Sequence, residues 1–279
     1  MNLAVPGHRV IDAFEKRPDF PIDSMTDLVL GLPGLLGGVS RSQVEWAEAL
    51  QPTTIIVWIG NNDALNAAIA GDTAALTPVA EFETAYSNLV KRLTATGATV
   101  VVANIPDVAV IPYVVSAKKA AALFGVPLPL FVAVLGISTN DFINLDHLAT
   151  AGAILQGVLP APLADNEFLD AAEIQQIREA TRRFNEIITA QAVANDAVLV
   201  DVNAFLNRLD RHGLVVGGHR LTTEFLGGIF SLDGIHPSNS GAAATANYFI
   251  KTMNRRAAAH LQPVNIRSIE RNDPLVFSR

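Results

Sequence analysis

Unbroken runs of β-branched and other apolar residues constrain the fold more than any other feature. The runs are Thr53–Ile59, Thr99–Ala103 and Ala197–Val200, and a further, very short one is Asn2–Val5. Strands that are covered on both faces have continuous apolar runs, whereas strands with one solvated face alternate apolar and polar residues. We therefore predict that these segments are buried strands of a parallel sheet.

Helical patterns fill the intervals between the runs. Apolar residues recur there at steps of three and four, and residue pairs with capping-box spacing precede two of the patterns. A regular alternation of strand and helix predicts right-handed crossovers and helices on both faces of the sheet. The predicted helices run from Ser42 with Glu45 to Leu50, from Thr77-Pro78 to Gly97, from Asp170 with Glu173 onward, and from Asn239 to about His260.

One long segment, about 106–168, interrupts the alternation. It is proline-rich and apolar without a clear period, and connections of this length are usually functional or carry their own elements. We interpret it as an insertion over the sheet edge that forms an acyl-binding or lid surface. An extra helical layer without substrate contact is an equal alternative. Ala120–Ile137 is uncharged, but it contains prolines and is short for a bilayer crossing, so we expect no membrane partner.

Composition removes several classes of function. The net charge is −7 and basic residues are scattered, which argues against nucleic-acid binding. The absence of cysteine excludes disulfides, thiolate catalysis and zinc–thiolate sites. We expect one domain over 1–279, with about 263–279 as a C-terminal tail, and no metal or organic cofactor.

The most specific motif is Asp233-Gly-Ile-His236, followed by Pro237. A carboxylate three residues before an imidazole can accept one ring N–H and leave the other nitrogen facing a reacting hydroxyl. This spacing predicts an acid–base pair. An isolated match of this kind is also compatible with a loop histidine that follows a turn-forming aspartate.

Two further positions follow predicted strands. Asn62, in Gly60-Asn61-Asn62-Asp63, can donate a hydrogen bond to a developing oxyanion, or it can cap a helix that begins near Asp63. Gly7 follows Asn2–Val5, where a backbone N–H without a side chain is a second candidate donor, although Pro-Gly marks any turn. His8 is better interpreted as a helix-start residue than as a catalyst.

Taken in this order, the three motifs resemble the later motif blocks of the SGNH, or GDSL, hydrolase family. The resemblance implies that Gly7 and Asn62 form the oxyanion hole and that Asp233 and His236 supply the base. It also implies a flavodoxin-like, doubly wound and mainly parallel sheet, and an ester or lipid substrate. The family's nucleophile is the serine of a Gly-Asp-Ser block upstream of the glycine block.

No Gly-Asp-Ser occurs in this chain. The resemblance therefore predicts an N-terminally truncated relative, without the first central strand and with its nucleophile outside the chain. Other serines lie near the motifs or before a helix, but none is expected on a strand-end turn that aims a nucleophile. They are Ser40, Ser42, Ser231, Ser238 and Ser240.

The resemblance predicts a serine ester hydrolase that acts through an acyl-enzyme. The alternative from another class is a non-catalytic protein that binds apolar ligands without turnover. A second alternative is a membrane-associated protein anchored through Ala120–Ile137. The resemblance is to a bacterial family with exported members, whereas Met1–Gly7 lacks the basic start and apolar stretch of a signal peptide, so the location stays open.

Overall fold

The computed structural model describes residues 1–19, 21–35 and 39–276. Its central sheet has the strand order β1-β2-β6, and both pairings are parallel. Thr54 lies opposite Thr99, and Val101 lies opposite Val198. The predicted parallel sheet is confirmed for three of the four runs, with β1 at Thr54–Val57, β2 at Thr99–Ala103 and β6 at Val198–Val200.

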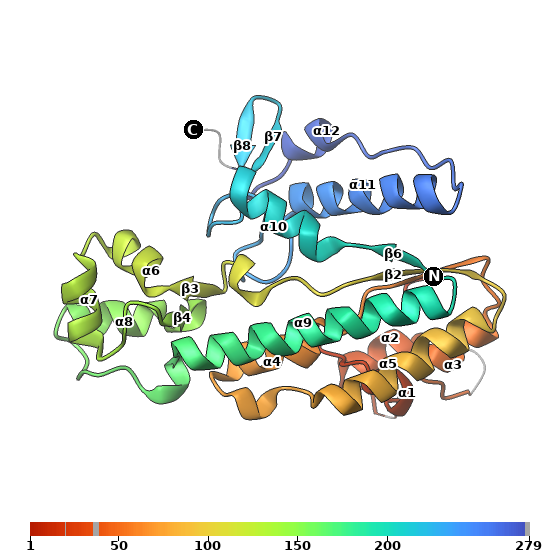
Figure 1. Cartoon of the computed structure of the whole chain (residues 1–279), viewed down its shortest axis with the longest axis horizontal. Helices are drawn as coiled ribbons and strands as arrows, with labels where there is room; N and C mark the ends of the chain where they lie inside the picture. Colours follow the sequence, from red (N-terminus) through yellow and green to blue (C-terminus); the bar gives the residue numbers. More distant parts are fainter. Residues whose placement is uncertain (20, 36–38, 277–279) are drawn as a thin grey trace.

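Helices cover both faces of this sheet (Figure 1). On one face, α5 (Val79–Thr94) and α9 (Ala171–Ala194) pack together, and the rings of Phe82 and Phe184 stack with centroids 4.1 Å apart. On the other face, α11 (Asn239–Arg256) contacts β6. The other helices of the body are α1 (Asp12–Glu15), α2 (Met25–Leu35), α3 (Gln43–Ala49), α4 (Asn61–Ala70), α10 (Val202–His212) and α12 (Ile266–Glu270).

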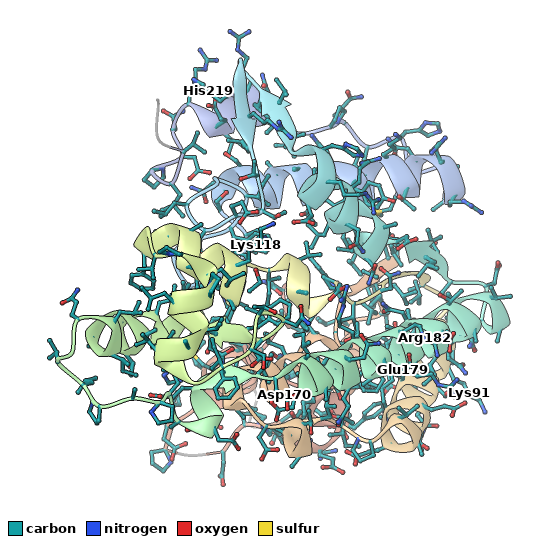
Figure 2. The ribbon with its side chains drawn as sticks, turned by 60° about the vertical axis from the view of Figure 1, so that its left-hand side comes forward. Lys91, Lys118, Asp170, Glu179, Arg182 and His219 are labelled. Carbon is teal, nitrogen blue, oxygen red and sulfur yellow. The ribbon has the colours of Figure 1, made fainter. Side chains whose placement is uncertain are left out.

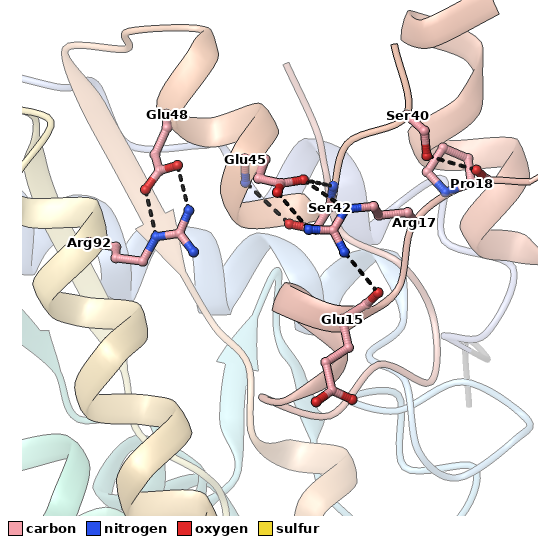
Figure 3. A network of polar contacts seen from close by, with 8 residues as sticks. All are labelled: Glu15, Arg17, Pro18, Ser40, Ser42, Glu45, Glu48 and Arg92. Carbon is pink, nitrogen blue, oxygen red and sulfur yellow. Dashed lines mark hydrogen bonds and ion pairs between the residues drawn. The ribbon is translucent and has the colours of Figure 1, made fainter.

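Both predicted capping boxes are present. Ser42 accepts the backbone N–H of Glu45, and the Glu45 carboxylate accepts the backbone N–H of Ser42. Asp170 and Glu173 repeat the arrangement at the start of α9. Figure 3 shows the Ser42 box and, beside it, a bidentate ion pair from Arg92 on α5 to Glu48 on α3.

The prediction of a strand at Asn2–Val5 is wrong, because this segment has no ladder partner. Side chains bind its backbone instead. Gln43 donates to the carbonyl of Leu3 at 2.7 Å, and Asn2 accepts the N–H of Ala4 at 3.0 Å. Val5 is buried against Leu30 and Trp46, so the segment is held in place without being part of the sheet.

The segment 106–168 forms a lobe at one end of the molecule (Figure 1). It has an antiparallel sheet, three helices and an apolar cluster of its own. The strands are β3 (Val114–Ser116), β4 (Phe142–Asn144) and β5 (Phe168–Leu169), and the helices are α6 (Ala117–Phe124), α7 (Leu128–Leu135) and α8 (Leu148–Leu155). Short 3₁₀ turns lie at Thr73–Ala75 and Val108–Val110 against the body, and at Leu145–His147 and Asp165–Glu167 in the lobe.

Helices α6 and α7 cover most of the apolar stretch 120–137. In the described part of the chain, no single helix has the length and apolarity to cross a membrane, and α6 with α7 pass that test only as a pair bent by 106°. The bend follows from Gly125, the C-cap of α6, and Pro127, the N-cap of α7. The lobe's predicted role as an acyl-binding or lid surface stays a prediction.

The predicted C-terminal tail, as far as the structure describes it, includes α12. Next to it lies an antiparallel hairpin, β7 (Leu214–Val216) with β8 (His219–Leu221). His219 of the hairpin contacts the buried carboxylate of Glu270 in α12. The tail is therefore packed against the body.

Candidate active site

The loop between β8 and α11 contains the predicted base. Nδ1 of His236 lies 2.7 Å from Oδ2 of Asp233, as their spacing predicted. Oδ1 of Asp233 accepts the backbone N–H groups of Ile235 and His236, each at 2.9 Å. The His236 side chain is 73% exposed. Because Nδ1 is bound to the carboxylate, Nε2 is the ring atom that can exchange a proton with a substrate or nucleophile.

The electrostatics of Asp233 suit an orienting carboxylate. Burial alone would raise its pKa, but hydrogen bonds from the Ser231 hydroxyl, the Ile235 N–H and the ring and N–H of His236 outweigh that effect. They hold the pKa of Asp233 well below its usual range. The carboxylate therefore stays ionised at neutral pH.

Contacts on both sides fix the backbone of this loop. The carbonyl of Gly234 accepts the N–H of Tyr113, in the 106–168 lobe, at 3.0 Å. Gly234 has φ +69°, and a Cβ there would lie 2.8 Å from the Tyr113 nitrogen, so this position requires glycine. On the other side, the N–H of Ser238 donates to the carbonyl of Ile229 at 3.0 Å, and the Ser238 hydroxyl accepts the N–H of Gly241 as the N-cap of α11.

Asn62 and Gly7 are neighbours in space although 55 positions separate them. The side-chain amide of Asn62 donates to the carbonyl of His8 at 2.9 Å, one residue beyond Gly7. Gly7 is exposed and has φ +80°, with nothing within 4 Å of a Cβ placed on it. The alternative role of Asn62 as an N-cap is wrong, because Gly60 caps α4 and Asn62 is its second residue.

His8 is a buried structural residue. Its Nδ1 lies 2.7 Å from Oε1 of Gln43, and its Nε2 lies 2.8 Å from Oγ1 of Thr26. Burial lowers the pKa of His8, which favours the neutral ring. The expectation of a helix-start residue is wrong, since α1 begins only at Asp12. With both ring nitrogens bonded, His8 is not available as a base.

A cavity of about 730 Å³ extends along the free edge of β1. Residues 1–5 line one side, and residues 54–62, including Asn62, line another. Ile56 and Trp58 in this region are 57% and 37% exposed. No Asp, Glu, Lys or Arg side chain is among its lining residues, which combine apolar side chains such as Leu3 and Trp58 with the amides of Asn2 and Asn62.

A larger cavity, of about 1020 Å³, lies along α9, away from these motifs. Its inner wall carries the amides of Asn104, Asn185 and Asn203, each of which is hydrogen-bonded within the protein. Asn185, for example, bonds both the N–H and the carbonyl of Ile105. These amides therefore hold in place the backbone segments that follow β2 and β6.

The serines near the motifs have structural contacts. Ser42 and Ser238 are N-caps, and the Ser40 hydroxyl donates to the carbonyl of Pro18. Ser240 is fully buried in α11, and its hydroxyl has no hydrogen-bond partner among the described residues. The Ser231 hydroxyl donates to Asp233, the same carboxylate that holds His236.

A model of the GDSL-like lipase/acylhydrolase family matches residues 1–249. The chain belongs to this family. LAE5, an α/β hydrolase enzyme from the metagenome of Lake Arreo in Spain, is similar at 15% identity over 89% of this chain and 69% of its own, with a TM-score of 0.41. A similarity that low carries no information on activity. A search of curated proteins gave no match.

Membership in the GDSL family makes the chain a hydrolase by family, and the family suggests ester hydrolysis. The structure forms two of the expected pairs, Asp233 with His236 and Asn62 beside Gly7. Among the described residues, no hydrogen bond joins one pair to the other, and His236 does not line the cavity along β1. A single site shared by all four residues therefore stays a prediction. No group of three or more His, Asp and Glu side chains in the described ranges is placed to hold a metal ion.

Sequence reasoning did not single out Asp63, although it follows Asn62 directly. Its side chain is 1% exposed, and Oδ2 accepts the N–H of Val10 at 3.0 Å. Burial raises the pKa of Asp63 to about 6, against the opposing effect of the hydrogen bond from the Val10 N–H. Asp63 thus connects the start of α4 to the segment after His8. The feature of the sequence that could have drawn attention to Asp63 is that it is an acidic residue in the first turn of a predicted helix.

Proposed function

We propose that the chain supplies the base and the oxyanion donors of a carboxylic ester or lipid hydrolase of the SGNH/GDSL type. In this mechanism, Nε2 of His236 accepts the proton of a serine hydroxyl, and the serine oxygen attacks the ester carbonyl. The Gly7 N–H and the Asn62 amide stabilise the oxyanion. His236 returns the proton to the leaving alcohol, and water then hydrolyses the acyl-enzyme by the same route.

The observation that carries this proposal is the 2.7 Å contact between Asp233 and Nδ1 of an exposed His236. An ionised carboxylate there fixes the tautomer and stabilises the imidazolium that forms during attack. Family membership supports the same chemistry. The serine block is not among the 279 residues, so the nucleophile is proposed to lie outside this chain.

The second candidate is a protein that binds apolar ligands without turnover. The cavity along β1, whose lining includes no Asp, Glu, Lys or Arg side chain, and the missing Gly-Asp-Ser favour it. The two candidates differ in whether a correctly placed serine becomes reactive.

The test uses a fluorophosphonate, which labels activated serines, and a p-nitrophenyl ester. The 279-residue chain is expected to give no burst and no labelling, because loss of a triad serine leaves activity roughly a thousandfold or more below the complete enzyme. Fusing to Met1 a strand-forming segment that ends in Gly-Asp-Ser is expected to produce both signals.

Two variants of the fused form test the proposed roles, and a third is the control. His236→Ala is expected to abolish both signals, and Asn62→Ala is expected to lower kcat about a hundredfold. Arg182→Ala, on the exposed face of α9 (Figure 2), is expected to change neither. A fused form that folds and binds an ester but never labels would favour the binding protein. Stoichiometric labelling of an internal serine in the original chain would show a relocated nucleophile.

A further inference from the structure

A carboxylate of the C-terminal segment, Asp273, lies against the first turn of α11. Asp273 is 5% exposed, and its Oδ2 accepts the backbone N–H of Ser240 at 2.7 Å. Its Oδ1 accepts the N–H of Leu275 at 3.1 Å. The first N–H groups of a helix have no partner within the helix, so Asp273 satisfies a buried donor that the helix cannot. Asp273 lies outside residues 1–249, which the family model matches.

Other bonds fix the same segment along the length of α11. Asn247 bonds both the carbonyl and the N–H of Val264, at 2.8 and 2.6 Å, and Asn254 does the same with Leu261, at 2.8 and 2.7 Å. The Asp273 contact therefore belongs to a continuous attachment between the C-terminal segment and the helix. A carboxylate attached in this way is held at the helix start.

The start of α11 is mechanically connected to the predicted base. Ser238 caps the helix two residues after His236, and its N–H donates to the carbonyl of Ile229. The carbonyl of His236 accepts the N–H of Ser231 at 2.8 Å. A Cβ on Gly241 would lie 2.0 Å from the Ile229 oxygen, so the first turn of the helix is in close contact with the loop. A movement of that turn therefore moves the backbone of His236.

We propose that Asp273 is a positioning residue for the Asp233–His236 pair, acting through the first turn of α11. The inference rests on the proposed function in one respect, that His236 is the base. Asp273 itself contacts no substrate. Its hydrogen bond to Ser240 holds the helix start in register with the loop, so that the imidazole is presented in one orientation.

Backbone hydrogen exchange on the 279-residue chain tests this proposal without any ester. Asp273→Ala is expected to speed exchange at the Ser240 amide about tenfold, because this buried N–H loses its charged acceptor. The amides of Ser231 and Ser238 keep their carbonyl acceptors, and their exchange is expected to speed up about tenfold only if the loop loosens together with the first turn of α11. Exchange in β2 is expected to change less than threefold. Asp273→Asn keeps an oxygen that can accept the same N–H, and it is expected to stay within about threefold of the unmodified chain.

Asp170→Ala is the matched control, because Asp170 caps α9, a different helix (Figure 2). It is expected to lower stability without a selective effect on the loop amides. Equal acceleration of the loop and of β2 in Asp273→Ala would show a purely global role and overturn the proposal. Failure of Asp273→Asn to restore slow exchange would also overturn it. Neither result bears on whether a restored serine becomes reactive, so the two proposals can fail separately.

Discussion

The loop that contains His236 and the segment that contains Gly7 are held in different ways. In the loop, backbone groups bond to nearby backbone groups, as in the N–H of Ser231 with the carbonyl of His236 and the N–H of Ser238 with the carbonyl of Ile229. The Asp233 carboxylate adds two further backbone bonds. Most of this network lies within ten residues of sequence.

The segment before Val10 depends instead on side chains from distant elements. Gln43 on α3 holds the carbonyl of Leu3, Asn62 on α4 holds the carbonyl of His8, and Asp63 holds the N–H of Val10. The comparison shows that the predicted base is ordered largely by its own loop, whereas the predicted oxyanion donors are ordered by helices far away in the sequence. The three predictions below test this difference.

The largest effect is expected for Gly241→Ala at the crowded start of α11. Alanine usually favours a helix over glycine, by about 1 kcal/mol. Here its Cβ would lie 2.0 Å from the backbone oxygen of Ile229, so the helix start must shift. We expect a loss of about 3 kcal/mol in the free energy of unfolding, measured with urea. A cost below about 1 kcal/mol would show that the loop is less closely packed than its contacts indicate.

The second prediction concerns Asp63 and the pH dependence of the free energy of unfolding. Its pKa in the folded protein is about 6, against 3.8 for an aspartate free in water, so the folded state favours the neutral acid. The resulting stabilisation is present below about pH 4 and is lost as the pH rises through 6. Asp63→Asn removes this titration. The free energy of unfolding of Asp63→Asn relative to the unmodified chain is therefore expected to rise by up to about 3 kcal/mol between pH 4 and 7.

Urea unfolding of both forms at several pH values measures this difference, and subtraction removes the contributions of other carboxylates such as Asp27 and Asp233. Both of these have lowered pKa values and oppose the trend. A relative stability that does not change with pH would mean that Asp63 is not the buried acid that connects α4 to Val10.

The smallest effect is expected for Gly7→Ala. Nothing lies within 4 Å of a Cβ at Gly7, so the cost is only that of φ +80° for a residue with a side chain, about 1 kcal/mol. Gly97→Ala is the matched control, because Gly97 has the same φ and equally open surroundings. The two variants are expected to unfold at similar urea concentrations. A Gly7→Ala cost as large as that of Gly241→Ala would remove the contrast between the two regions.

The features that could be predicted from the sequence are those that depend on interactions between residues close together in the chain. Three of the four β-branched runs form the parallel sheet, and Ser42, Asp170 and their partners form capping boxes, because each of these features depends on residues within a few positions. The pairing of Asp233 with His236 belongs to the same class, since the three-residue spacing itself brings the two groups together.

Features that depend on distant partners could not be predicted. Asn2–Val5 has the composition of a strand but no neighbour to pair with, so its backbone bonds to side chains. Asparagine is a favourable N-cap residue, but Gly60 occupies the N-cap of α4, and the Asn62 side chain donates to the carbonyl of His8 instead. In both cases the local preference was overridden by which groups the fold placed nearby.

The sequence by itself thus determined the three strands of the parallel sheet, the capped starts of α3 and α9, and the acid–base pair, because short-range hydrogen bonds and apolar runs specify them. Only the tertiary structure decided which groups hold those elements in place. Tyr113 reaches Gly234 from the lobe, and Asp273 reaches Ser240 from the C-terminal segment. A buried N–H must find an acceptor wherever the packed chain supplies one, and no local pattern in the sequence specifies that acceptor.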